Sequence, residues 1–143
     1  MVNTLLDAVT KQLGKKFGTS YHYYTEDVEQ NFVKPCFTVD ARLPVQRSKS
    51  PILYDRTMPL VIHYFTDNEK TKKRELYNMG EQLFECLEHL NFEGGLLRGR
   101  DVSWRVTEGV LQFFITYKFT TTKIDLDREP MELLETTNTT TNI

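Results

Sequence analysis

The stretch VSWRVTEGVLQFFITYKFTTT, residues 102–122, contains the strongest strand pattern in the chain. In its second half, Leu111, Phe113, Ile115, Tyr117 and Phe119 alternate with Gln112, Phe114, Thr116, Lys118 and Thr120. An alternation with a period of two is typical of a strand that is buried on one face. The dipeptide Glu108-Gly109 separates Val102–Thr107 from Val110–Thr122 and favours a hairpin between them. The stretch therefore predicts two paired antiparallel strands.

Three more strands are predicted upstream of this hairpin. Cys36–Leu43 alternates cleanly and is typical of a half-buried strand, and Ser20–Tyr24 predicts a short one. Arg56–Phe65 is apolar on both faces toward its end, which indicates a central strand, although Pro59 predicts a bulge or an edge segment within it. Between these strands, Pro44–Pro51 (PVQRSKSP) is predicted to be a basic loop.

Two helices complete the predicted fold. The first covers Thr4–Phe17, with Thr4 and Asp7 as a capping box and Gly18 as the stop. The second covers Asn68–Leu90, is capped by Asp67, and carries four cations near its start that oppose the helix dipole. The order of elements predicts an α+β fold, in which both helices pack on one face of a twisted, mostly antiparallel sheet of four to five strands.

The length of 143 residues indicates a single domain, which we expect over residues 1–123. Residues 124–143 differ in composition, because they hold five acidic residues and one basic residue and end in a run rich in Thr and Asn. We expect this acidic C-terminal tail to be partly flexible. Within it, Glu129–Glu135 predicts a short amphipathic turn that presents Met131, Leu133 and Leu134.

Motifs that carry chemistry do not stand out, so we expect no catalytic, cofactor-binding or metal-binding residues. Cys86 and His89 lack a second pair at zinc-site spacing, and His63 near Asp67 is more typical of a packed or surface histidine than of a catalyst. Both cysteines, Cys36 and Cys86, fall in apolar patterns and are predicted to be small core residues without a disulfide. The sequence also has no typical signal peptide and no apolar run that fits a membrane span, which predicts a protein of the cytoplasm.

Two features indicate interaction surfaces instead. The first is a set of basic residues that frame the PVQRSKSP loop, namely Arg42, Arg47, Lys49 and Arg56. Such residues are either solvated or directed to an acidic partner or a phosphate backbone. The second is the number of aromatic residues in the predicted sheet. Because two helices cannot cover both of its faces, we expect Phe114 and either Tyr64 or Phe65 to be partly exposed, which favours a protein interface.

Three stretches of the chain resemble a known family of structural proteins. They are YYTEDVEQNFVKPCFTV (Tyr23–Val39), PLVIHYF (Pro59–Phe65) and LLRGRDVSWRVTEGVLQFFITYKF (Leu96–Phe119). With the helices around them, the match covers about residues 4–123. It is to the tail terminator family of tailed phages and phage-like particles from Gram-positive bacteria.

The resemblance implies a virion protein that is assembled in the host cytoplasm. Tail terminators form a ring, typically hexameric, on the head-proximal end of the tail tube. The ring stops tube polymerisation and docks the head–neck complex. The implied partners are copies of the chain, the tail tube protein, a neck or head-completion protein, the sheath protein if the tail contracts, and DNA that passes through the lumen without sequence readout. No membrane partner is implied.

The resemblance adds a hypothesis and leaves alternatives open. Two different faces are needed for a head-to-tail ring, and the acidic C-terminal tail of one subunit against a basic loop or helix start of its neighbour is a candidate pair. The alternatives are a neck or head-completion (stopper) protein, a small hydrolase or nuclease that uses His63, and a nucleic-acid-binding module that uses Arg47, Lys49 and Arg56.

Overall fold

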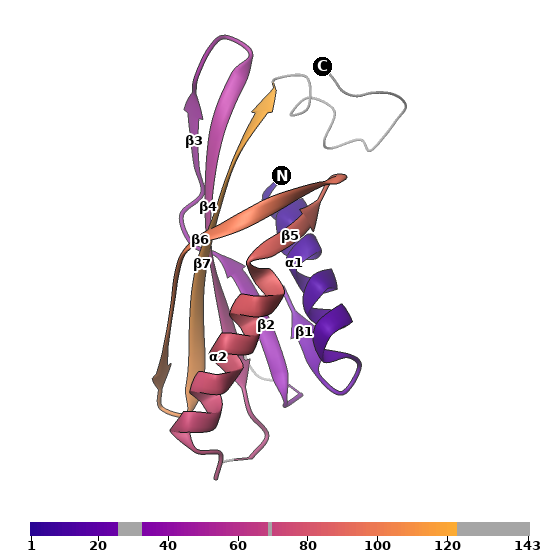
Figure 1. The fold of residues 1–143 in the computed structure, drawn as a ribbon, viewed down its shortest axis with the longest axis vertical. Coiled ribbons are helices and arrows are strands. Elements are labelled where there is room, and N and C mark those ends of the chain that lie inside the picture. Colours follow the sequence, from indigo (N-terminus) through magenta and orange to yellow (C-terminus); the bar gives the residue numbers. More distant parts are fainter. Residues whose placement is uncertain (26–32, 69, 123–143) are drawn as a thin grey trace.

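A computed structural model describes residues 1–25, 33–68 and 70–122 of the chain, and Figure 1 shows their arrangement. The elements in chain order are α1 (Val2–Phe17), β1 (His22–Tyr24), β2 (Cys36–Ala41), β3 (Val45–Ser48), β4 (Leu53–Phe65), α2 (Lys73–Leu87), β5 (His89–Phe92), β6 (Gly95–Thr107) and β7 (Val110–Thr122).

The strands form one mixed sheet in the order β1-β2-β4-β7-β6-β5, and β3 pairs with the remaining part of β4. Seven strands are present in the described part of the chain, and β1 runs parallel to β2 while the other pairs are antiparallel. The prediction of four to five mostly antiparallel strands was therefore wrong, although the α+β class is compatible with the structure. The extra strands, β3 and β5, have four residues each, and their partners in the sheet rather than their own pattern make them strands.

β7 pairs with β6 on one side and with β4 on the other. The prediction for the hairpin was confirmed, because β6 and β7 meet at the Glu108-Gly109 turn, where both residues have positive φ. β7 then pairs with β4 over thirteen residues, from Val110 opposite Phe65 to Thr122 opposite Leu53. Pro59 lies inside β4, where its neighbour on one edge changes from β3 to β2, so its missing N–H interrupts no ladder there.

The second helix is shorter than its sequence pattern predicts. α2 covers Lys73–Leu87 instead of Asn68–Leu90, and His89–Phe92 is the strand β5. The chain turns at Glu88, whose carbonyl oxygen accepts a hydrogen bond of 2.7 Å from the amide of Gly99 in β6. The pairing of β5 with β6 therefore ends the helix, although the leucine spacing continues to Leu90.

α1 begins at Val2, two residues before the predicted start, and ends at Phe17, where Gly18 with a φ of 84° is the C-cap residue. The predicted capping box of Thr4 and Asp7 was wrong, because the N-cap residue is Met1 and no side chain caps the helix.

Both helices lie on the same side of β2, β4 and β7 in Figure 1, and the core lies between these two layers. The alternation of β7 is confirmed, since Leu111, Phe113, Ile115 and Tyr117 are at most 1% exposed. Cys36 and Cys86 are both free and buried, as predicted from their apolar surroundings. The β3–β4 hairpin and the end of β7 extend past the helices at one end of the molecule (Figure 1).

Candidate functional site

Neither α1 nor α2 covers the second face of the sheet (Figure 1), and we call this face the open face. The strand registers set the order of side chains across it. Asp40 in β2 lies opposite Val61 in β4, Val61 lies opposite Phe114 in β7, and Phe114 lies opposite Ser103 in β6. Phe114 and Phe65 are half-buried on this face, whereas Tyr64 belongs to the core at 8% exposure. Partial exposure was therefore confirmed for Phe114 and for Phe65.

Phe114 in β7 lies between two arginines, Arg42 directly after β2 and Arg105 in β6. The Arg42 Cζ lies 5.6 Å from the centroid of the Phe114 ring, and the Arg105 Cζ lies 5.7 Å from it. The Arg105 Nε also donates a 2.7 Å hydrogen bond to Oε1 of Gln112, which fixes the guanidinium beside the ring. A cation over an exposed aromatic face contributes about 0.5–1 kcal/mol, so the cluster is held by weak contacts that a partner can extend.

The cations of this cluster have no acidic partner among the described residues. Neither Arg42 nor Arg105 forms an ion pair with a carboxylate in the part of the chain that the structure describes. The registers and the Arg42–Phe114 contact place the following charged residues on the open face: Arg42, Arg47, Arg100, Arg105 and Lys118, with Asp40 and Asp55 as the carboxylates. The open face therefore carries a net positive charge.

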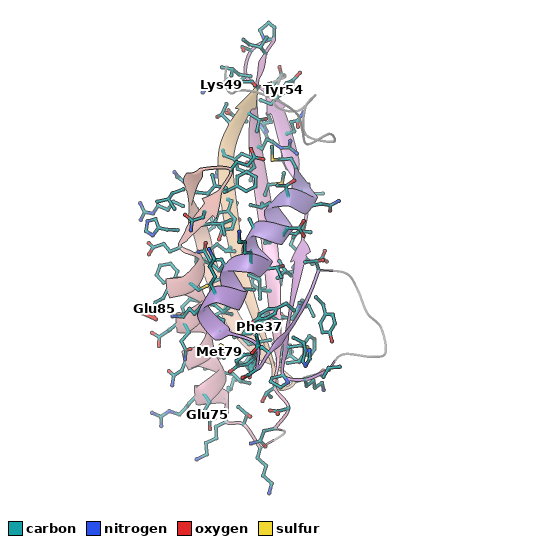
Figure 2. The ribbon with its side chains drawn as sticks, turned by 90° about the vertical axis from the view of Figure 1, so that its right-hand side faces the viewer. Phe37, Lys49, Tyr54, Glu75, Met79 and Glu85 are labelled. Carbon is teal, nitrogen blue, oxygen red and sulfur yellow. The ribbon has the colours of Figure 1, made fainter. Side chains whose placement is uncertain are left out.

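The four basic residues predicted as one set are separated in space. Arg42 contacts Phe114, whereas Arg47 lies in β3 and Lys49 follows β3 at the far end of the hairpin, as the label in Figure 2 shows. Both Arg47 and Lys49 are exposed. PVQRSKSP is thus a strand with its turn, and the prediction that it is a loop was wrong.

Arg56 faces the opposite side of the sheet, toward the core. It is only 9% exposed, and its Nε and the Oγ1 of Thr121 are buried with no hydrogen-bond partner in the described residues. Burial lowers the pKa of the Arg56 guanidinium. Arg56 is therefore not available as a surface contact in the way that Arg42 is. The remaining interface candidates, Met131, Leu133 and Leu134, lie outside the described residues.

His63 lies on the open face, where its ring stacks on Phe65 at 6.1 Å between centroids. Burial lowers its pKa, the Arg42 charge lowers it further, and Asp40 opposes both effects. No hydrogen bond or ion pair connects His63 to Asp67 in the described structure, so the suggested acid–base pair is not formed. Burial also raises the pKa of the Cys86 thiol to about 11, and no set of three potential metal ligands occurs among the described residues.

A second charged surface lies on the outer side of α2. Glu81 and Glu85 are exposed there and border a hollow of about 680 Å³, together with Phe84 and Trp104. Figure 2 shows Glu85 pointing away from the body of the molecule. Neither glutamate forms an ion pair among the described residues, whereas Glu88 lies 3.9 Å from the guanidinium of Arg98. We call this the acidic face of α2.

The packing of α2 on β6 determines where this acidic face lies. A Cβ at Gly80 would lie 2.7 Å from Trp104 Cγ and closer still to Cδ1 and Nε1, so only glycine permits this approach. Trp104 in turn stacks on Phe113 at 5.7 Å between ring centroids.

Sequence reasoning missed Arg105, Glu81 and Glu85. The position of Arg105 could have been predicted from the sequence, because the two-residue turn at Glu108-Gly109 places it opposite Gln112 and beside Phe114. The two glutamates are four residues apart and so share a helix face, but nothing local indicates that this face borders Trp104.

No helix in the described residues is long and apolar enough to cross a membrane. A small α+β domain with one uncovered basic sheet face and one acidic helix face is typical of a protein that associates with other chains. Residues 4–129 match the family described as phage tail terminator protein, and the chain belongs to that family. It is therefore a structural protein of the phage tail and a component of the virion.

Other comparisons add little. No curated protein matches the chain. Several solved structures are similar in fold; one of them, of a protein without a descriptive name, has 10% identity and a TM-score of 0.41, over 85% of this chain and 94% of that chain. A likeness of this size says nothing about function.

Proposed function

We propose that this protein forms a hexameric ring on the head-proximal end of the tail tube. The ring stops polymerisation of the tube protein and presents a docking surface to the neck or head-completion protein. In a contractile tail it also contacts the last sheath ring, and DNA passes through its lumen without sequence readout. Assembly takes place in the host cytoplasm. The observation that carries the proposal is the family match over residues 4–129.

The described surfaces support a role in assembly. A ring subunit needs two different faces that meet head-to-tail and close by rotation. The open face and the acidic face of α2 differ in charge, and the β3–β4 hairpin projects from one end (Figure 1). The acidic C-terminal tail, residues 124–143, is a further contact element in this proposal, directed at the basic hairpin tip or the start of α2 in a neighbour. Deletion of the tail should then weaken ring assembly, and unchanged assembly would remove it from the proposal.

Length control of tail tubes tests the proposed function directly. Purified protein is added to polymerising tail tube protein, and tube lengths are measured by negative-stain microscopy. We expect shorter tubes with increasing protein, each with a ring at one end. Tubes that overgrow while the protein still joins heads to finished tails would identify a stopper of the neck instead. Phage production that is lost with His63→Ala, with correct tails, would favour an enzyme.

A further inference from the structure

We infer that the open face of one subunit packs against the acidic face of α2 in the next subunit, with Arg42 and Arg105 opposite Glu81 and Glu85. The inference rests on the proposed ring and identifies the two surfaces that build it. It concerns contacts between copies of this chain, and all four side chains lie in the described structure.

The two surfaces match in chemistry. On the open face, Phe114 lies between two guanidiniums, at 5.6 Å and 5.7 Å from their Cζ atoms. On the acidic face, the side chains of Phe84 and Trp104 border the hollow beside the two glutamates. The aromatic ring with two cations on the open face therefore has a counterpart with two carboxylates and an aromatic border. Hydrogen bonds between Arg and a carboxylate are charge-assisted, and they are stronger than hydrogen bonds between neutral groups.

The charged groups on both surfaces lack an oppositely charged partner in the part of the subunit that the structure describes. Among the described residues, neither the two arginines nor the two glutamates form an ion pair. Hydrogen bonding of the Arg105 Nε to Gln112 leaves the terminal nitrogens of that guanidinium for another acceptor.

The charge order along α2 also indicates an external partner. Cations cluster near its start at Lys72, Lys73 and Arg74, and the sequence from Glu75 to Leu97 contains no Lys or Arg. The helix dipole favours the opposite order, with acids at the start and bases at the end, by about 0.3–1 kcal/mol per charge. The effect is confined to the terminal turns, so in the inferred contact an arginine of the neighbouring subunit would offset the unfavourable charge of Glu85 in the last turn.

The positions of the surfaces suit a ring. α2 packs on the core side of the sheet (Figure 1), so the acidic face of α2 and the open face are two different surfaces of one subunit. Two different surfaces make a head-to-tail contact, which builds a closed ring when the rotation between neighbouring subunits closes.

Paired charge reversal tests the contact in the full-length protein. One variant carries Arg42→Glu and Arg105→Glu, the other Glu81→Arg and Glu85→Arg. We expect each alone to need a roughly tenfold higher concentration to assemble, measured by mass photometry, because two attractive pairs become repulsive. A mixture of the two variants should assemble within about threefold of the natural protein, since every contact in an alternating ring is complementary again.

The matched control changes the same amount of charge elsewhere. Lys11→Glu with Lys15→Glu reverses two exposed cations on α1 and should leave assembly unchanged. Circular dichroism of each variant confirms that the fold is retained.

Each other outcome overturns the contact in a distinct way. Loss of assembly only with the arginine variant would assign the open face to another acidic partner, such as the C-terminal tail. Intact rings that lose salt-sensitive DNA binding would assign it to nucleic acid. Normal assembly of both variants would reject the contact while tube capping still supports the proposed function, and failure of the natural protein to cap tubes would reject that function itself.

Discussion

Substitution of Gly80 by alanine sets two opposing effects against each other. Gly80 lies inside α2 and is buried against the indole ring of Trp104. An added Cβ would lie 2.7 Å from Trp104 Cγ and closer to two other ring atoms, well inside van der Waals contact. The indole must therefore move, and with it its stacking on Phe113.

The magnitudes decide the direction of the change. Alanine in place of glycine favours a helix by about 1 kcal/mol. Overpacking of a core contact costs about 1–3 kcal/mol, and a disturbed aromatic pair costs about 0.5–1.5 kcal/mol more. Gly80→Ala should therefore lower the free energy of unfolding by about 0.5–3.5 kcal/mol, although alanine is the better helix former.

Urea unfolding followed by tryptophan fluorescence measures this effect, because Trp104 is the single tryptophan of the chain. With a slope of about 1–3 kcal/mol per molar urea, the midpoint should fall by about 1 M. Gly14→Ala is the matched control, since Gly14 lies in α1 and a Cβ there meets nothing within 4 Å. That variant should gain about 0.5–1 kcal/mol. A Gly80→Ala protein that is stabilised to the same extent would refute the described packing of α2 on Trp104.

Three further predictions concern polar side chains that the structure buries wholly or in part. Tyr117→Phe should cost about 1–2 kcal/mol in urea unfolding, because its buried hydroxyl donates a 2.6 Å hydrogen bond to the Leu87 carbonyl at the end of α2; an unchanged midpoint would contradict that bond. Gln12→Ala removes three hydrogen bonds from α1 to the junction of α2 and β5, so amide exchange in β5 should become faster, whereas equal protection in both proteins would show that the bonds are not made. Because the pKa of His63 is lowered in the folded state, its contribution to stability is present above pH 6.5 and lost as the pH falls through the folded value. Acid titration of His63→Gln should show a shallower loss of stability below pH 6.5, and an identical curve would argue against burial of this ring.

Local sequence patterns were sufficient to predict the bounds and the buried residues of a strand where burial alternates with a strict period of two. The alternation of Val110–Thr122 predicted the bounds of β7 and its core residues, and Gly18 ended α1 as expected. The same reasoning missed β3 and β5, because a four-residue strand depends on its partner for its hydrogen bonds. It also extended α2 to Leu90, since apolar spacing alone does not show that the Glu88 carbonyl meets the amide of Gly99.

For the candidate surfaces too, the sequence indicated single residues but not their contacts. Sequence reasoning singled out Arg42 and Phe114, but as separate features. Their contact arises because β4 lies between β2 and β7 in the sheet, and no local pattern contains this order of strands.

The sequence by itself determined which residues are buried along Val110–Thr122, where the central hairpin turns, and that charge is unevenly placed along the chain. These properties follow from local period and composition. The tertiary structure alone decided that Arg42 and Arg105 share one aromatic ring, that Arg56 is buried while Arg47 is exposed, and that Glu81 and Glu85 border a hollow beside Trp104. The physical reason is that strand order and helix approach bring together residues from distant parts of the chain, and the interaction surfaces consist of such residues.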